Sequence, residues 1–283
     1  MPADESTATQ AVPAWSAPFL AQSRGTHPHA TPFDGFDRER AWGGATGGGV
    51  RVAVVDSGVD AHHPAMAGAV VRSVRVEKSG EDYSVVDDPE ASDSVGHGTA
   101  CAGIIRSLAP DVEFISVRVL GADNRASGVA FAHALDWVID ERIEVVNLSL
   151  SSRSEDLFAT FHDLADRAYF SNCLFVCSAS NIPGLASYPS LFPSVVSVAS
   201  HDIPDPWTIF YNPDPPVEFG AWGIDVPVAW QGGSTLVASG NSFATPHISA
   251  LAALIRSKHP QLTPFELKAV LATVATRVTN DSQ

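Results

Sequence analysis

The chain has few of the features that mark membrane proteins, nucleic-acid binders and disulfide-rich proteins. Its 283 residues include only three cysteines, and no apolar run approaches the roughly 18 residues needed to cross a bilayer. Lysine and arginine number 17 against 32 aspartates and glutamates, a formal net charge of −15. Because nucleic-acid phosphates require a basic surface, neither nucleic acid nor membrane is expected as a partner. Net acidity favours basic partners in general and says nothing about the charge of one site.

The scarce cysteines do not form a disulfide framework. Cys173 and Cys177 lie in the segment CLFVC, which we expect to be a buried strand. Four residues of strand separate their Cα atoms by about 13 Å, whereas a disulfide needs Cα atoms within about 7 Å. The N-terminus also lacks an export signal, since Asp4 and Glu5 come early and Pro13 interrupts the apolar stretch. We therefore expect reduced thiols and a cytoplasmic protein.

The pattern of the chain predicts an extension followed by one α/β domain. Residues 1–35 are rich in alanine, proline, serine and threonine, and we expect an extended or partly disordered arm there. Short apolar runs in residues 36–283 predict buried strands of a parallel sheet, at RVAVVD (51–56), EFISVRVL (113–120), EVVNLSL (144–150), CLFVCSA (173–179) and SVVSVAS (194–200). Helical patterns lie between them, so the fold class is α/β.

Three helices have clear signals in the sequence. One is predicted over residues 128–142, and another is entered at Ser242 and stops near Pro260. The last helix begins after Thr263, which is followed by a proline and, three residues on, by Glu266. Those residues predict a capping box at its first turn.

Three polar motifs contain the groups that a serine hydrolase needs. A hydroxyl must attack the carbonyl, a base must take its proton, and a carboxylate must hold the base in one tautomer. Asp56 follows an apolar run, His97 lies between two glycines in GHGTACAG, and Ser242 lies in SGNSFATPHISA. Taken singly, each residue also has a structural interpretation: Asp56 as a turn cap, His97 as a packing residue and Ser242 as a helix N-cap.

Taken together, the motifs resemble those of the subtilisin-like serine proteases, the subtilases. VVDSGVD, GHGTACAG and GNSFATPH are similar to the family's aspartate, histidine and serine motifs, in the same order. The resemblance covers about residues 36–280. It implies a three-layer α/β/α fold with a mainly parallel sheet, and a serine endopeptidase with Asp56, His97 and Ser242 as its triad. It also implies that Asn181 and the Ser242 amide donate hydrogen bonds to the oxyanion.

The resemblance also implies where a substrate lies. Family members bind an extended peptide between two backbone edges of the cleft. The matching residues are Ser149, Leu150 and Ser151 on one side, and Arg125, Ala126 and Ser127 on the other.

The sequence departs from the family pattern mainly beside the specificity pocket. Ser151 and Ser152 replace pocket glycines, and the short path from Asn181 to Tyr188 removes part of the pocket rim. Asn241 stands in place of the usual threonine before the serine. These departures put specificity in doubt and delete no catalytic group.

Two departures concern metals and thiols. Many subtilases wrap calcium with an insertion after the histidine helix, but here CAGIIRSLAPDV leads directly into EFISVRV. We expect no tight calcium site there and no cofactor. We also expect no other metal site, because the one candidate pair, His62 and His63, is adjacent in sequence and its side chains point in different directions. Cys101 puts a free thiol one helical turn from His97.

Three functions stay open on this evidence. The first is an endopeptidase of restricted specificity that processes a precursor or leader peptide. The second is a binding protein that keeps the fold without the activity, which the intact Asp56, His97, Asn181 and Ser242 argue against. The third is a peptide ligase or macrocyclase in which an amine resolves the acyl-enzyme. For a protease, an inhibitory arm around residues 13–20 is the alternative to restricted specificity.

Overall fold

A computed structural model describes residues 35–80, 82–121, 123 and 125–278, together with Pro13, Ser16 and Leu20. The expected extended arm over residues 1–35 therefore lies almost wholly outside the described residues. No helix of the described part is both long enough and apolar enough to cross a membrane.

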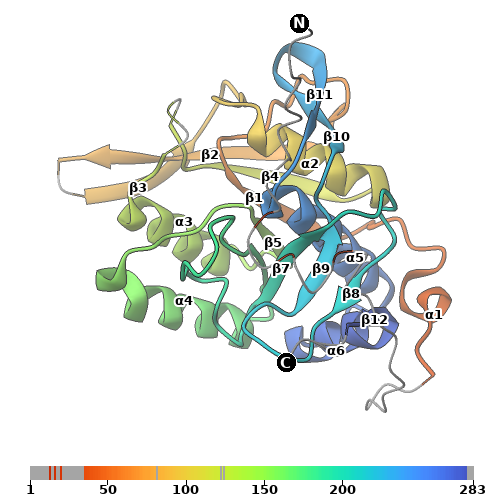
Figure 1. Ribbon diagram of the computed structural model, residues 1–283. Coiled ribbons are helices and arrows are strands. Elements are labelled where there is room, and N and C mark those ends of the chain that lie inside the picture. The colour runs from red at the N-terminus through yellow and green to blue at the C-terminus, as the bar shows by residue number, and fades with distance from the viewer. Residues whose placement is uncertain are drawn as a thin grey trace, which may run out of the picture.

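A ten-stranded sheet forms the centre of the described chain (Figure 1). Its strands are β1 (Arg51–Asp56), β2 (Val70–Ser79), β3 (Asp82–Asp87), β4 (Glu113–Arg118), β5 (Val145–Leu148), β6 (Leu174–Ser178), β7 (Val196–His201), β8 (Phe210–Tyr211), β9 (Phe219–Trp222) and β12 (Thr276–Arg277). Their order is β12-β8-β9-β7-β6-β5-β1-β4-β2-β3, and only the pairs β2–β3 and β8–β9 are antiparallel. A separate hairpin pairs β10 (Val226–Trp230) with β11 (Ser234–Ala238).

Helices cover both faces of the sheet, so the fold has three layers (Figure 1). The helices are α1 (Arg38–Trp42), α2 (His97–Leu108), α3 (Gly128–Asp140), α4 (Phe158–Phe170), α5 (Asn241–Lys258) and α6 (Pro264–Val274), with short 3₁₀ turns at Glu155–Leu157 and Gln231–Gly233. Buried residues of α2, α5 and α6 share one core with the sheet, and those of α3 and α4 share the other.

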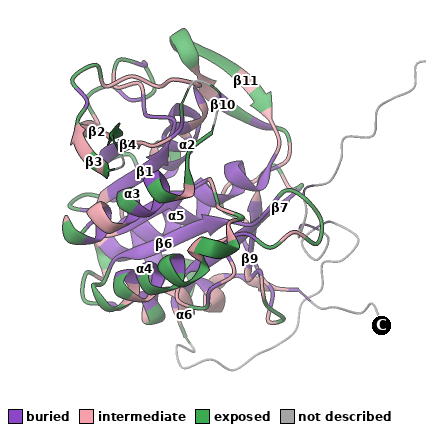
Figure 2. Cartoon of the chain, turned by 90° about the vertical axis from the view of Figure 1, so that its left-hand side faces the viewer, coloured by how far each residue is buried: buried purple, intermediate pink, exposed green. Residues whose placement is uncertain are grey.

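The central strands form because they are apolar on both sides. In β1, Val52 and Val54 enter the core with α2 and α5, while Ala53 and Val55 enter the core with α3 and α4. This alternation is expected where a parallel strand is covered on both faces. Figure 2 shows the result, with the central strands and α5 almost entirely buried. The predicted α/β fold and its five central strands are thus confirmed.

Helix ends follow the sequence signals with one correction. The capping box of Thr263 and Glu266 is present at α6. Helix α5 begins at Asn241, one residue before the predicted entry, and its N-cap is Gly240. Ser242 is therefore the second residue of the helix and not its N-cap. The N-cap, Gly240, has an extended backbone. The connection from α2 to β4 consists of residues 109–112 alone.

Candidate active site at the carboxyl ends of the central strands

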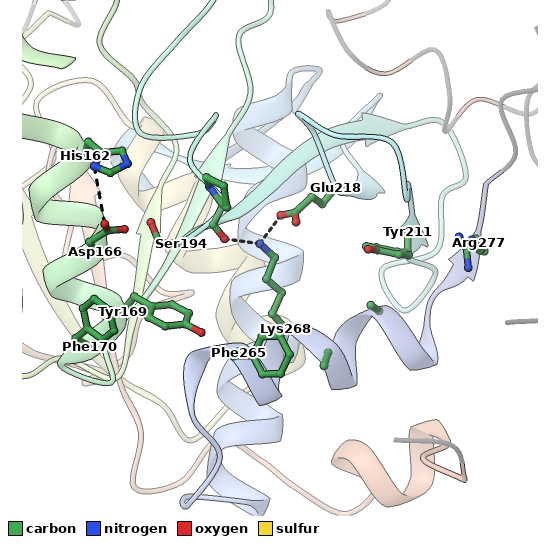
Figure 3. A pocket seen from close by; sticks show the side chains of 13 residues that line it. His162, Asp166, Tyr169, Phe170, Ser194, Tyr211, Glu218, Phe265, Lys268 and Arg277 are labelled. Atoms are coloured by element: carbon green, nitrogen blue, oxygen red, sulfur yellow. Dashed lines mark hydrogen bonds and ion pairs between the residues drawn. The ribbon is translucent and has the colours of Figure 1, made fainter. Parts of the chain in front are cut away.

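Two large hollows of similar volume lie on the surface, and only one is lined by the residues predicted to be catalytic. The first, of about 740 Å³, lies between α4, α6 and the short strands β8 and β12. Figure 3 shows Lys268 reaching across it to Glu218. The Lys268 ammonium lies 2.7 Å from that carboxylate and donates to the carbonyls of Pro193 and Val195 at 2.9 and 2.8 Å. Its charge is already satisfied, so we place the reaction in the second hollow.

The second hollow, of about 720 Å³, opens where the central strands end. Parallel strands end at the same edge of a sheet, where ligands bind in open α/β folds. Asp56 is the last residue of β1, Ser149 follows β5 and Asn181 follows β6. The hollow is lined by most of the predicted site residues, namely His97, Arg125, Ala126, Ser127, Ser149, Leu150, Ser151, Asn181 and Ser242. Its volume is typical of ligand-binding pockets.

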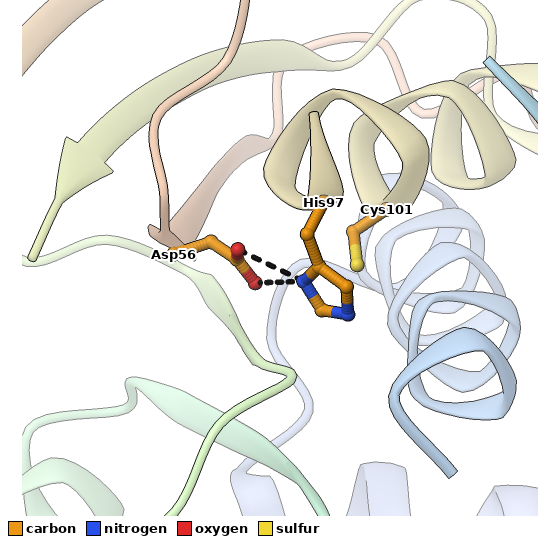
Figure 4. A group of neighbouring side chains, drawn as sticks. All are labelled: Asp56, His97 and Cys101. Carbon is orange, nitrogen blue, oxygen red and sulfur yellow. Dashed lines mark hydrogen bonds and ion pairs between the residues drawn. The ribbon is translucent and has the colours of Figure 1, made fainter. Parts of the chain in front are cut away.

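Asp56 and His97 form a buried carboxylate–imidazole pair (Figure 4). Nδ1 of His97 lies 2.9 Å from each oxygen of Asp56. The Asp56 side chain is completely buried and that of His97 is 14% exposed. A carboxylate at Nδ1 holds the proton on that nitrogen, so Nε2 is the atom that can accept a proton. This is the pairing that a general base requires.

Asp93 holds the loop that presents the histidine. Its carboxylate accepts hydrogen bonds from the N–H groups of Gly96 and Thr99, at 2.6 and 2.8 Å, and from Ser57 Oγ at 2.7 Å. Burial lowers the pKa of His97, but the charge and hydrogen bond of Asp56 and the charge of Asp93 outweigh it, so this pKa lies above its usual value. The imidazole is therefore protonated at a higher pH than a free imidazole.

The glycine after the histidine is required by close packing. A Cβ at Gly98 would overlap the carbonyl oxygen of Gly58, in the loop that follows β1. Any larger residue would push α2 away from Asp56. The prediction that glycines beside His97 permit a close backbone approach is therefore correct for Gly98.

Ser242 is the second residue of α5, and its backbone carbonyl is fixed by two hydrogen bonds. Its carbonyl oxygen accepts Ser149 Oγ at 2.8 Å and the Cys101 thiol at 3.5 Å. The N-terminus of a helix also favours a developing negative charge. The side chain of Ser149 is thus bound within the protein, and the substrate contact predicted at this residue is one of its backbone.

Asn181 presents its amide nitrogen toward the serine. Its Oδ1 accepts the Asn241 N–H at 2.9 Å, which turns Nδ2 the other way. Both Asn181 Nδ2 and Ser242 Oγ surround the space that a Cβ would fill at Gly240, at 3.7 and 3.4 Å from it. An N–H donor and a hydroxyl therefore face the same space beside Gly240, an arrangement in which Asn181 can donate to an oxyanion formed at Ser242.

The rim of the hollow is closed by a backbone pairing. Ser152 and Tyr188 exchange two hydrogen bonds, at 2.9 and 2.8 Å, and so join the segment after β5 to the chain beyond Asn181. The hollow is also lined by Arg153, Ile182 and Leu185, which the sequence analysis did not single out. The sequence marks these residues only by their position, next to Ser151 or within the short path from Asn181 to Tyr188.

Cys101 completes a compact cluster with the acid and the base. The potential ligand atoms of Asp56, His97 and Cys101 lie within 4.8 Å of one another, the one such group of three found among the described residues. Burial, followed by the charge of Asp56, raises the pKa of the Cys101 thiol well above its usual value. Without a bound metal ion, this environment therefore favours the neutral thiol over the thiolate. The predicted neighbour of His97 is in place.

The thiol predicts sensitivity to mercurials. Mercury binds sulfur strongly, and an adduct on Cys101 would displace the His97 ring (Figure 4). We expect a stoichiometric mercurial to abolish peptide hydrolysis by the native chain, and Cys101→Ala to retain activity and lose the sensitivity. Cys177→Ala is the matched control, because that thiol is also fully buried and free. Protection by Cys177→Ala instead would place the reactive thiol in β6.

Comparisons with known proteins agree with the geometry. The model of the subtilase family matches residues 47–283. The chain is 30% identical over 243 residues to the thermostable alkaline protease of Halalkalibacterium halodurans, covering 82% of this chain and 64% of that protein. It thus spans slightly under two thirds of that protein's length. Identity to subtilisin BL of Lederbergia lenta is also 30% over 243 residues, with coverages of 82% and 86%. The crystal structure of a cold adapted subtilisin-like serine proteinase superposes with a TM-score of 0.68 at 28% identity, covering 82% of this chain and 84% of that one.

Proposed function

This chain belongs to the subtilase family, and from that premise we propose that it is a cytoplasmic serine endopeptidase of restricted specificity, which processes a precursor or leader peptide. Ser242 attacks the scissile carbonyl, and Nε2 of His97 takes the hydroxyl proton and returns it to the leaving amine. Asp56 keeps His97 in the required tautomer. Asn181 and the Ser242 N–H stabilise the oxyanion of each tetrahedral intermediate. Water then releases the acyl group.

The Asp56–His97 pair carries this proposal. An aspartate that is fully buried and unpaired would be costly, and the imidazole both pairs it and reaches the hollow. Hydrogen bonds to Asp93 then fix the position of the pair. A protein that only bound peptides would not need a buried carboxylate aimed at Nδ1. The free state of all three cysteines supports the cytoplasmic assignment.

The rim supports restricted specificity. The Ser152–Tyr188 pairing joins two segments beside the hollow, and Ser151 and Ser152, which replace glycines of the family pattern, line it. Ile182 and Leu185 add apolar surface. A pocket with mixed polar and apolar walls discriminates against side chains that leave its polar groups unpaired.

The charges of the hollow favour acidic substrates. Arg125 and Arg153 are both exposed along it, and none of the described residues that line it is acidic. This contrasts with the net charge of −15 for the whole chain. Cations beside a cleft raise the local concentration of an anionic ligand, so the preferred substrate carries aspartate or glutamate near the scissile bond.

One contact favours an inhibitory arm as a second means of restricting cleavage. Ser16 is fully buried, and its hydroxyl donates to Asn241 Oδ1 at 3.3 Å. Leu20 is also buried. Residues from the N-terminal extension thus contact the residue that precedes the nucleophile.

Deletion of residues 1–30 separates the two explanations. If the pocket restricts cleavage, the full chain and the truncated chain will both cleave casein weakly, and both will select one motif with acidic residues from a mixed peptide library. If the arm inhibits, truncation will raise casein cleavage many-fold. Product masses from the library distinguish hydrolysis, which adds water, from transfer of the acyl group to an amine. Cleavage of no peptide by either form would defeat the proposed endopeptidase.

The charge preference has its own test. Arg125→Glu with Arg153→Glu should reverse the preference for acidic peptides, whereas Arg106→Glu, at a half-buried residue of α2 that does not line the hollow, should not. An unchanged preference would assign specificity to the pocket walls alone.

A further inference from the structure

Asn241 occupies a position between the nucleophile and three separate segments of the fold. It is the first residue of α5 and its side chain is completely buried. A buried amide has two donor hydrogens and an accepting oxygen, all of which need partners. The family pattern has threonine at this position, so the contacts made by the Asn241 amide are a departure from that pattern.

The accepting oxygen of Asn241 binds the end of β7. Oδ1 accepts the N–H and the hydroxyl of Ser200, at 2.9 and 3.0 Å. It also accepts the hydroxyl of Ser16, from the N-terminal extension, at 3.3 Å. Ser200 is itself completely buried, and a Cβ at Gly223 would overlap its hydroxyl, so it is tightly enclosed. Oδ1 is thereby fixed against the sheet.

The donating nitrogen of Asn241 binds the loop that carries Asn181. Nδ2 donates to the carbonyls of Ala179 and Ser180, at 3.3 and 3.1 Å. These are the two peptide groups directly before Asn181. One side chain thus joins the end of β7 to the backbone that sets the position of the oxyanion donor.

The backbone of Asn241 also orients the Asn181 amide itself. Its N–H donates to Asn181 Oδ1 at 2.9 Å, which leaves Nδ2 on the side of the Ser242 hydroxyl. Threonine could supply the same N–H, but its single hydroxyl cannot satisfy two carbonyls on one side and three donors on the other.

We propose that Asn241 is a positioning residue, which acts through Asn181 to hold the oxyanion hole in place. The proposal rests on the proposed endopeptidase function. Without the Nδ2 bonds the carbonyls of Ala179 and Ser180 are left buried and unpaired, and the loop shifts to satisfy them. A misplacement of about 1 Å at a reacting group can cost about 10²-fold in rate.

The sharpest variant is Asn241→Asp, which keeps the shape and replaces the donor by an acceptor that faces two carbonyls. We expect kcat for the preferred peptide to fall about 10- to 100-fold with KM nearly unchanged. Asn241→Ser, which keeps one hydroxyl, provides a milder variant if the aspartate prevents folding, and its kcat should fall in the same direction.

Asn212→Ala is the matched control. This asparagine is also buried, donates to the carbonyls of Asp214 and Val217 at 2.7 and 2.9 Å, and accepts the Asp214 N–H at 3.1 Å. It does not line the catalytic hollow. Its loss should lower the melting temperature, as loss of Asn241 does, while kcat stays at the native value.

A double-mutant cycle with Asn181→Ala completes the test. If Asn241 acts through Asn181, then Asn241→Ser should change kcat less than about twofold in the Asn181→Ala background, because the group it positions is gone. Equal losses in both backgrounds, or a kcat loss in Asn212→Ala as large as in the Asn241 variants, would overturn the proposal. A native chain without peptidase activity would instead defeat the endopeptidase assignment on which it rests.

Discussion

Replacement of Ser242 by alanine is expected to lower kcat for peptide hydrolysis on the order of 10⁶-fold, the magnitude known for the nucleophile of subtilisin. The substitution removes the only atom that forms the acyl-enzyme in the proposed mechanism. The fold should survive, since the contacts that hold this residue are made by its backbone carbonyl. Initial rates on the preferred library peptide measure the effect.

A second serine of the same helix supplies the control for that substitution. Ser257 lies near the far end of α5 and donates to the Gly48 carbonyl at 2.9 Å. Ser257→Ala should keep the native kcat. Native activity in Ser242→Ala, or an equal loss in both variants, would remove Ser242 from the role of nucleophile.

Asn181→Ala is expected to reduce kcat by about 10²–10³-fold and to leave KM almost unchanged, again by the magnitude known for the subtilisin oxyanion donor. The amide N–H bonds the oxygen only after it becomes negatively charged, so the loss falls on the transition state and spares the ground state. Steady-state kinetics that resolve kcat from KM measure the difference. A loss below about tenfold would mean that another donor stabilises the oxyanion.

The central sheet could be predicted because its strands carry their own signal. Burial on both faces makes β1 and β4 to β7 nearly continuous apolar runs. Such a run can be recognised from the local sequence, without knowledge of the strand's neighbours. The hairpin of β2 and β3 was not predicted. It lies at the edge of the sheet, where β2 mixes valines with Arg72, Arg75, Glu77 and Lys78 and only Val74 is buried, so apolar content alone misses it.

The residues that meet at the candidate site could be predicted because each lies in a short motif. The walls of the hollow could not, since they depend on contacts between distant parts of the chain. Arg153 and Leu185 reach the same hollow because Ser152 pairs with Tyr188, and nothing local to either segment records that pairing. The role of Asn241 is hidden for the same reason: its side chain bonds to Ser16, Ser200, Ala179 and Ser180, which are neighbours only in the folded chain.

Covalent labelling of the nucleophile tests the central claim most directly. A fluorophosphonate forms a stable bond only with a serine activated by a base, so we expect one adduct per chain. Digestion and mass spectrometry should place that adduct on Ser242, and prior reaction with a peptide aldehyde should prevent it. His97→Ala, which keeps the serine and removes its base, should label far more slowly. An adduct on any other serine, or equal labelling of native protein and His97→Ala, would contradict the assignment of Asp56, His97 and Ser242 as the catalytic triad.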